Sequence, residues 1–339
     1  MKFVRLLALA GWLSLQAPLP WVAGATPLLT LPGRTAAGGA GGPVIQRSLV
    51  IPGRIDSLLA LPSGQVAVLV GRVSSPIRFL PHDDLLRVTL SSGAVLRVPL
   101  PPYIVPPGLA ASGGGVAVVV DDMLLWVAGT GRLAARWPLD MAAVGWPAAV
   151  TADRAGRLYL AGQEADAWSA QVEALSPLGR VLWRVPLGLT HAGIWLGMAG
   201  PRELAAYLPD AHDAQGALAL FDTHSSRLRA SYALPAAPLA IDAARGLLYL
   251  GTGAGTIQTR ALSSGRLLFT VPGAVPLALC ASTGWVAFTR GNEVVVTVPQ
   301  TLQVKTSLRL PGVTALTFTA DGTLLAGVGA RLDEIMARL

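Results

Sequence analysis

The residues of this sequence that could do chemistry are mainly carboxylates and histidines in short polar segments. The densest of these segments supply five candidate metal ligands, Glu164, Asp166, Asp210, His212 and Asp213. Carboxylate oxygens are the ligands that hard cations such as Ca²⁺ prefer, but the run from Asp210 to Gly216 lacks the ligand spacing of a calcium loop. Asp, Asn and Gly are also the residues that solvated turns use. We therefore expect no metal site, and these five residues are the candidates if the segments converge.

Other acidic segments follow the same pattern. They are His82-Asp83-Asp84, Asp121-Asp122 and Asn292-Glu293. Each lies between apolar runs, so we interpret each as a solvated turn that joins two strands.

Nucleophilic catalysis has little support in the sequence. None of the four histidines (His82, His191, His212 and His224) lies in a recognisable nucleophile motif, and there is no Gly-x-Ser-x-Gly elbow. The one cysteine, Cys280, lies in an apolar run, where a thiol behaves as a small buried hydrophobe. A single cysteine also excludes a disulfide within the chain. We expect no catalytic residues and no cofactor.

Tryptophans are the other side chains with a possible functional role. Six of the nine lie between residues 126 and 195, and most should fill the wedges between neighbouring sheets. Trp146 and Trp168 lie next to expected loops, so they are the candidate partner contacts.

The elements that position these residues recur along the chain. Each repeat has a turn glycine, one variable residue and then alternating aliphatic residues, and one copy has Arg in place of the glycine. The copies start at Gly64, Gly114, Gly156, Arg202, Gly246, Gly284 and Gly322. Their spacing matches the repeat of about 40 to 50 residues that a four-stranded propeller blade needs. The fifth repeat reads most clearly, with strands expected at 238–241, 247–251, 256–261 and 266–271. The sequence therefore predicts an all-β, seven-bladed propeller.

The two ends of the repeat array predict how the ring closes. The segment Gln46–Gly53 matches Lys305–Gly312 at Ser, Leu, Pro and Gly, and the second segment is the expected outer strand of the sixth repeat. The last repeat begins at Val313 and ends about where its own outer strand should start. We therefore expect the N-terminal strand Val44–Ile51 to complete the C-terminal blade, which would remove an exposed sheet edge.

The repeats resemble those of seven-bladed propellers of the WD-repeat-like and PQQ-like (YVTN-type) families, over roughly residues 44 to 339. The segment Ala174–Trp183 carries the resemblance best, with a small-apolar strand, a turn glycine and a strand that ends in tryptophan. Ser-Gly pairs such as Ser92-Gly93 and Ser264-Gly265 stand where PQQ-like repeats have Asp-Gly or Thr-Gly. The resemblance implies the propeller fold. PQQ-dependent dehydrogenases commonly have a vicinal cysteine pair, which a chain with one cysteine cannot form.

The N-terminal region predicts export. Lys2 and Arg5 precede the apolar run 6–15, and Ala23-Gly24-Ala25 is the pattern that a signal peptidase cleaves. The apolar run is much shorter than the ~20 residues of a membrane-spanning helix. We expect a signal peptide at 1–25, a flexible Gly-rich leader at 26–43 and the propeller domain at 44–339, in the periplasm or outside the cell and with no membrane span after cleavage.

Composition and charge limit the partners. Without Lys2 and Arg5 the 26 basic residues fall to 24 against 19 acidic ones, and this net charge of +5 is spread along the chain. A net charge this small does not indicate a nucleic-acid partner. The sequence therefore predicts an exported, non-catalytic, monomeric scaffold that binds a protein or cell-envelope partner. The alternative is a hydrolase or oxidoreductase with its site at the propeller channel.

Overall fold

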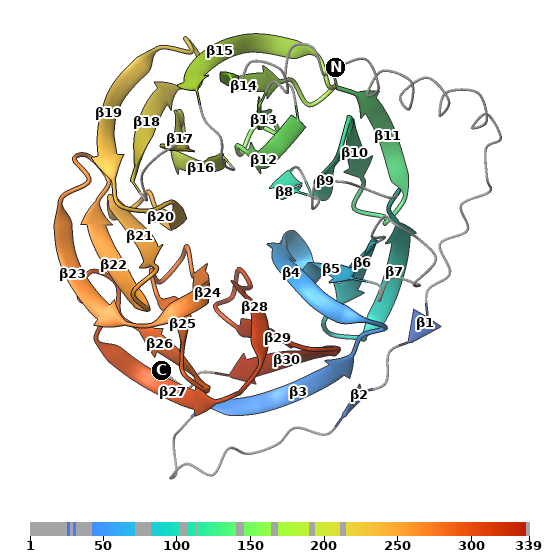
Figure 1. Cartoon of the computed structure of the whole chain (residues 1–339). Coiled ribbons are helices and arrows are strands. Elements are labelled where there is room, and N and C mark those ends of the chain that lie inside the picture. The colour runs from blue at the N-terminus through green and yellow to red at the C-terminus, as the bar shows by residue number, and fades with distance from the viewer. Residues whose placement is uncertain are drawn as a thin grey trace, which may run out of the picture.

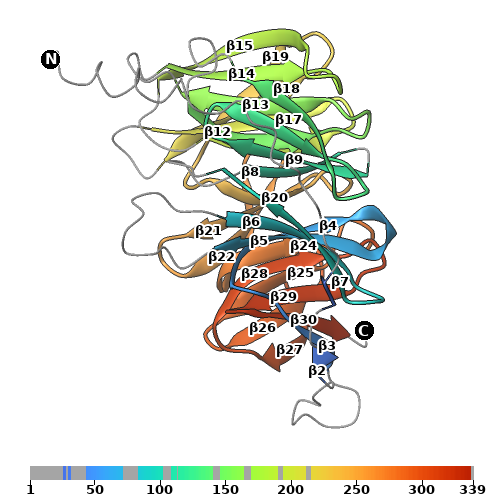
Figure 2. The same cartoon turned by 90° about the vertical axis from the view of Figure 1, so that its right-hand side faces the viewer.

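The structure, a computed structural model, describes residues 26–27, 30–31, 43–71, 83–101, 108–112, 114–139, 146–163, 169–189, 194–210 and 215–336. These residues form seven antiparallel sheets arranged radially in a ring (Figure 1). The view turned by 90° shows the ring edge-on, with β15 and β19 at one side and β27 and β3 at the other (Figure 2). The prediction of an all-β, seven-bladed propeller is confirmed.

The first four blades each consist of consecutive strands. Blade one has β4 (Arg54–Leu61), β5 (Gln65–Gly71), β6 (Asp83–Thr89) and β7 (Ala94–Pro99). Blade two has β8 (Gly108–Ser112), β9 (Gly115–Val120), β10 (Met123–Val127) and β11 (Leu133–Pro138). Blade three has β12 (Trp146–Ala152), β13 (Leu158–Gln163), β14 (Ser169–Leu175) and β15 (Val181–Leu189). Blade four has β16 (Trp195–Gly200), β17 (Glu203–Pro209), β18 (Gly216–Asp222) and β19 (Leu228–Leu234).

The remaining blades include the one that joins the ends of the chain. Blade five has β20 (Pro238–Asp242), β21 (Leu247–Thr252), β22 (Thr256–Ala261) and β23 (Leu267–Pro272). Blade six has β24 (Ala274–Leu279), β25 (Val286–Arg290), β26 (Glu293–Thr297) and β27 (Val304–Arg309). Blade seven has β28 (Val313–Phe318), β29 (Leu324–Val328), β30 (Arg331–Met336) and β3 (Val44–Val50).

Blade seven is assembled from both ends of the chain. The C-terminal repeat supplies β28, β29 and β30, and β3 pairs antiparallel with β30 in the outer position. The Oγ of Ser48 donates a hydrogen bond of 2.6 Å to a carboxylate oxygen of Asp333, which is fully buried. Leu49 and Ile51 are also buried, in a cluster with residues of blades seven and one.

Two short strands precede β3. Strand β1 (Thr26–Pro27) pairs antiparallel with β7, and β2 (Thr30–Leu31) pairs antiparallel with β3. Each adds a fifth strand to the outer edge of a blade, at blades one and seven. The outer edges of this propeller can therefore accept an extended segment.

The second strand of each blade carries the repeated signature because it is covered on both faces. All six residues of β9 are buried, and so are the five central residues of β5. A strand packed on both faces reads as a continuous apolar run rather than an alternating one. The hydrophobic clusters accordingly lie at the seams between neighbouring blades.

Hydrogen bonds of one kind cross several seams. A side chain on the third or outer strand of one blade donates to a main-chain carbonyl oxygen in the turn before the outer strand of the next blade. The donor and acceptor pairs are Arg47 to Leu90, Arg87 to Ala128, Trp183 to Thr223 and Tyr232 to Leu262. These bonds fix how neighbouring blades are rotated relative to one another at these four seams.

Glycine in those turns leaves room for the large side chain of the preceding blade. Gly265 has φ +67°, and a Cβ added there would lie 2.6 Å from Cδ2 of Tyr232. Gly64 has the same φ of +67°, and a Cβ there would meet nothing within 4 Å.

We predict that Gly265→Ala destabilises the protein more than Gly64→Ala does. Both substitutions place alanine at positive φ, which costs about 1–2 kcal/mol, but only Gly265→Ala also overpacks the seam, at about 1–3 kcal/mol more. Urea unfolding of the two variants beside the parent protein measures the difference. Equal losses of unfolding free energy would contradict the close contact between Gly265 and Tyr232.

Candidate functional site

The candidate metal ligands fall mostly outside the described residues. Glu164, Asp166, His212 and Asp213 all lie there. Asp210 is exposed just after β17, and its main-chain N–H donates to the Gln215 carbonyl oxygen at 2.9 Å. Within the described ranges, no group of three or more His, Cys, Asp or Glu side chains could hold a metal ion. The expectation that the chain has no metal site stays a prediction.

We predict that millimolar calcium leaves the melting temperature of the protein unchanged. A cation that bound only the folded state would raise it by mass action. Differential scanning calorimetry with and without calcium is the test, with the double variant Asp210→Asn/Asp213→Asn as control. A rise of several degrees that the double variant loses would show that the acidic segments do bind the ion.

The interpretation of Asp84 as part of a solvated turn is wrong. Asp84 lies within β6, is 3% exposed, and forms an ion pair of 2.7 Å with Arg97 of β7. A buried carboxylate needs such a partner, and Arg97 lies too far along the chain for the local pattern to reveal it. Glu293 likewise belongs to a strand, β26, and pairs with Arg290 at 3.4 Å.

A cavity of about 300 Å³ lies near the inner ends of blades three, four and five. Its lining is Ala152, Asp153, Arg154, Met198, Gly200, Pro201, Ala243 and Ala244. Asp153 is its buried acidic group. The oxygens of that carboxylate accept bonds from the N–H groups of Ala155 and Arg157, the Arg157 guanidinium (2.7 Å) and the Tyr159 hydroxyl (3.0 Å). Burial and then this carboxylate raise the pKa of Tyr159 to about 12.

Asp242 occupies the corresponding turn of blade five. It accepts from the N–H of Arg245 at 3.2 Å and from the Arg245 guanidinium at 3.1 Å. The same guanidinium donates to the Thr283 carbonyl oxygen of blade six at 2.9 Å. Asp153 therefore stabilises its own turn, and Asp242 stabilises its turn and, through Arg245, the seam with blade six.

The two candidate tryptophans cannot be assigned to a surface. Trp146 starts β12, where its backbone pairs with Gln163, and its side chain lies outside the description. Trp168 lies outside the described residues. Two other tryptophans pack at seams. Trp137 covers Gly179 of the next blade, and Trp183 bonds to blade four and lies 5.9 Å from the ring of Tyr159.

The surface feature that our sequence interpretation missed lies on the outer strands. Seven large apolar side chains are exposed on blades three to five, and we name them the rim surface: Leu178, Val181, Leu182, Leu189, Leu228, Leu267 and Phe269. Leu178 and Leu189 are the most exposed of them, at 72% and 73%. An outer strand with one face in water should alternate apolar and polar residues. The three consecutive apolar residues Val181-Leu182-Trp183 break this alternation, and they could have indicated an exposed apolar surface.

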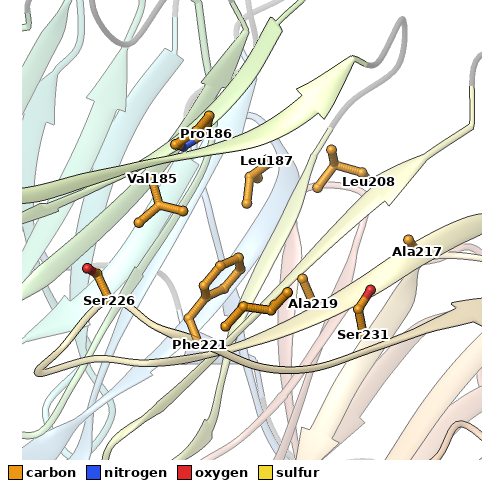
Figure 3. A pocket seen from close by; sticks show the side chains of 10 residues that line it. Val185, Pro186, Leu187, Leu208, Ala217, Ala219, Phe221, Ser226 and Ser231 are labelled. Atoms are coloured by element: carbon orange, nitrogen blue, oxygen red, sulfur yellow. The ribbon is translucent and has the colours of Figure 1, made fainter.

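A groove opens on this rim between blades three and four (Figure 3). It has a volume of about 250 Å³, and most of its lining is apolar. The lining residues are Val185, Pro186, Leu187, Leu208, Ala217, Ala219, Phe221, Ser226, Leu228 and Ser231. Side chains of β15 form one wall, and those of β18 and β19 form the floor and the other wall.

Comparisons with known proteins establish the fold and no family. No protein-family model matches the sequence, and no curated protein is similar to it. The structure is similar to that of U3-55K, with a TM-score of 0.63 and 14% identity over 86% of this chain and 98% of that one. It is also similar to the WD40 propeller domain of Doa1, with a TM-score of 0.59 and 10% identity over 93% and 98% of the two chains. BamB from Moraxella catarrhalis has a TM-score of 0.55 and 15% identity over 92% and 100%. These similarities agree with the resemblance to WD-repeat-like and PQQ-like propellers, and they show the propeller fold.

Proposed function

We propose that this protein is an exported, non-catalytic, monomeric scaffold that binds a protein or cell-envelope partner through the rim surface. The observation that carries the proposal is the exposure of seven large apolar side chains, six on the outer strands of blades three to five and one in the turn before β15, with Leu178 and Leu189 more than 70% exposed. Large exposed apolar side chains that gather on neighbouring elements are a feature of interaction sites on soluble proteins. Covering these side chains with a partner would remove them from water, which is favourable by about 25 cal/mol per Å².

The carboxylates near the channel support binding over catalysis at that end of the ring. Asp153 accepts four hydrogen bonds from its own turn and strand, and Asp242 accepts two from Arg245. A carboxylate has about four acceptor sites, so Asp153 cannot take a substrate proton without losing a structural bond, and Asp242 is held in an ion pair with Arg245. The export part of the proposal rests on the signal-peptide pattern of residues 1–25. No helix that could cross a membrane occurs in the part of the chain that the structure describes.

Co-purification from envelope extracts tests the binding proposal. The tagged full-length chain is compared with the double variant Leu182→Asp/Leu189→Asp on blade three. The matched control is Val304→Asp/Met336→Asp, which changes two exposed apolar residues on blades six and seven. We expect the same partner with the parent chain and the control, and its loss from the blade-three variant. Equal recovery by all three proteins would overturn the rim surface as the binding site.

N-terminal sequencing of the protein recovered from the envelope or medium tests export. The chain should begin near Thr26. A retained Met1 in a membrane fraction would show that the first residues are an anchor.

A further inference from the structure

Blade four departs from the other blades at a position that faces a seam. In each blade, one residue of the third strand pairs with the fifth residue of the repeated signature. From blade one to blade seven this residue is Leu86, Leu125, Glu173, Ala219, Gln258, Val295 and Asp333. Blade four thus has a single methyl group where the other six blades have a side chain of at least three heavy atoms.

The position two residues earlier on the third strand shows the same departure. It is Asp84, Met123, Gln171, Ala217, Thr256, Glu293 and Arg331 from blade one to blade seven. Two alanines on one face of the third strand give blade four less side-chain volume at these positions than any other blade has. The groove between blades three and four lies over both of them. The outer strand adds only Ser231 opposite Ala219.

The size and lining of the groove indicate what it can hold. Val185, Leu187 and Phe221 present apolar surface, and the hydroxyl groups of Ser226 and Ser231 are the polar side-chain groups of its lining. Its volume of about 250 Å³ is below the ~300–1,000 Å³ of pockets that enclose drug-sized molecules. The groove therefore fits one or two anchoring side chains of a partner rather than an enclosed cofactor.

One exposed cation adjoins the groove. Arg227 lies between the lining residues Ser226 and Leu228. The carboxylates of Glu203 and Asp222 pair with Arg229 on the face of blade four that is turned toward blade five, because their neighbours Leu204 and Phe221 pack in the seam with blade three. An anchor with acidic neighbours matches Arg227.

We infer that this groove is a docking site for an extended segment of a partner protein, in which an aromatic or branched aliphatic anchor fills the groove and acidic residues flank it. The inference rests on the proposed scaffold function and names the partner's chemistry. The outer edges of blades one and seven already accept extended segments, β1 on β7 and β2 on β3. An extended segment on the rim is therefore a geometry that this molecule itself uses.

Two probes test the site on the full-length chain. The first is 8-anilinonaphthalene-1-sulfonate, a dye with an aromatic body and one negative charge. The second is a labelled heptapeptide, Gly-Asp-Val-Phe-Val-Asp-Gly, compared with the same peptide carrying Lys for Asp and with one carrying Ser for Val and Phe. We expect saturable binding of the dye and competition at least tenfold stronger by the acidic anchored peptide than by the other two.

The matched variants are Ser231→Phe and Ser307→Phe. Both serines are exposed on outer strands and occupy the same register position, opposite Ala219 in blade four and opposite Val295 in blade six. Ser231→Phe should fill the groove and weaken both probes at least tenfold, and Ser307→Phe should leave them unchanged. Arg227→Glu should weaken the acidic peptide at least threefold, and added salt should reduce that difference.

Three outcomes would overturn the inference. They are equal binding of the probes by the two phenylalanine variants, a preference for the basic peptide, and binding that appears only when residues 1–42 are removed. The last result would make this chain's own N-terminal region the occupant. The peptides could fail to bind while the blade-three variant Leu182→Asp/Leu189→Asp still loses its envelope partner. In that case the groove is not the docking site, and the proposed scaffold function is still supported.

Discussion

Removing residues 26–52 should lower the melting temperature of the protein by more than about 10 °C, or leave a chain that aggregates. The deletion takes away β3, the outer strand of the blade that joins both ends of the chain. It exposes β30 as an unpaired edge, and such an edge is a template for pairing with other chains. Light scattering and differential scanning calorimetry, with the chain starting at Thr26 as reference, measure both effects.

The size of the effect follows from what β3 and the residue after it bury. Leu49 is 2% exposed and Ile51 is 1% exposed, and both pack in the cluster between blades seven and one. Burying each such side chain contributes about 1.5–3 kcal/mol, and the strand also satisfies Asp333 through Ser48. The sum approaches the whole stability of a typical domain, about 5–15 kcal/mol.

A shorter deletion is the control. A chain starting at Pro43 lacks β1 and β2 but keeps all of β3, and it should melt within a few degrees of the reference. If the chain without residues 26–52 is as stable as the reference, the closure of the ring by β3 contributes nothing and the account of blade seven is wrong.

Asp333→Ala should cost about 3 kcal/mol of unfolding free energy, or roughly 5 °C in melting temperature for a domain of about 300 residues. Asp333 is fully buried and accepts from Ser48 at 2.6 Å and from the Arg331 guanidinium at 2.7 and 2.9 Å. Alanine leaves the buried Ser48 hydroxyl and the Arg331 side chain without this partner. The cost is at the low end for a broken buried pair because the Arg331 side chain is 36% exposed.

The comparison for Asp333 is Glu293→Ala. Glu293 pairs with Arg290 at 3.4 Å, but the two side chains are 42% and 43% exposed. Exposed pairs of this kind contribute about 0–1 kcal/mol. Equal destabilisation by the two alanine substitutions in urea unfolding would show that the Asp333 contacts do not hold β3 to β30.

The ring itself could be predicted from the sequence because the second strand of each blade is packed on both faces. That burial forces an apolar run after a turn glycine, and seven such runs with near-constant spacing are visible without any alignment. The third strand of blade five was predicted at 256–261, and the structure has β22 at Thr256–Ala261. Strands whose residue types are set by burial on both faces can therefore be predicted from the sequence pattern alone.

The candidate site could not be predicted in the same way, because it depends on which residues meet across seams. Ala217 and Ala219 look like ordinary small strand residues until the register aligns them with larger residues in other blades. Asp84 looked like a turn residue because its partner Arg97 lies on another strand. The exposure of Leu182 and Leu189 depends on β15 being an outer strand with one uncovered edge, a position in space rather than a pattern in the chain.

Site-specific photo-crosslinking tests the rim surface most directly. The photoreactive residue p-benzoylphenylalanine replaces Leu182 on blade three, Val304 on blade six or Ala243 near the channel, each in the full-length chain. We expect one partner protein to crosslink at position 182 in intact cells, with little or no product at positions 304 and 243. A partner that crosslinks at position 243 and not at position 182 would place the functional surface at the channel and contradict the account.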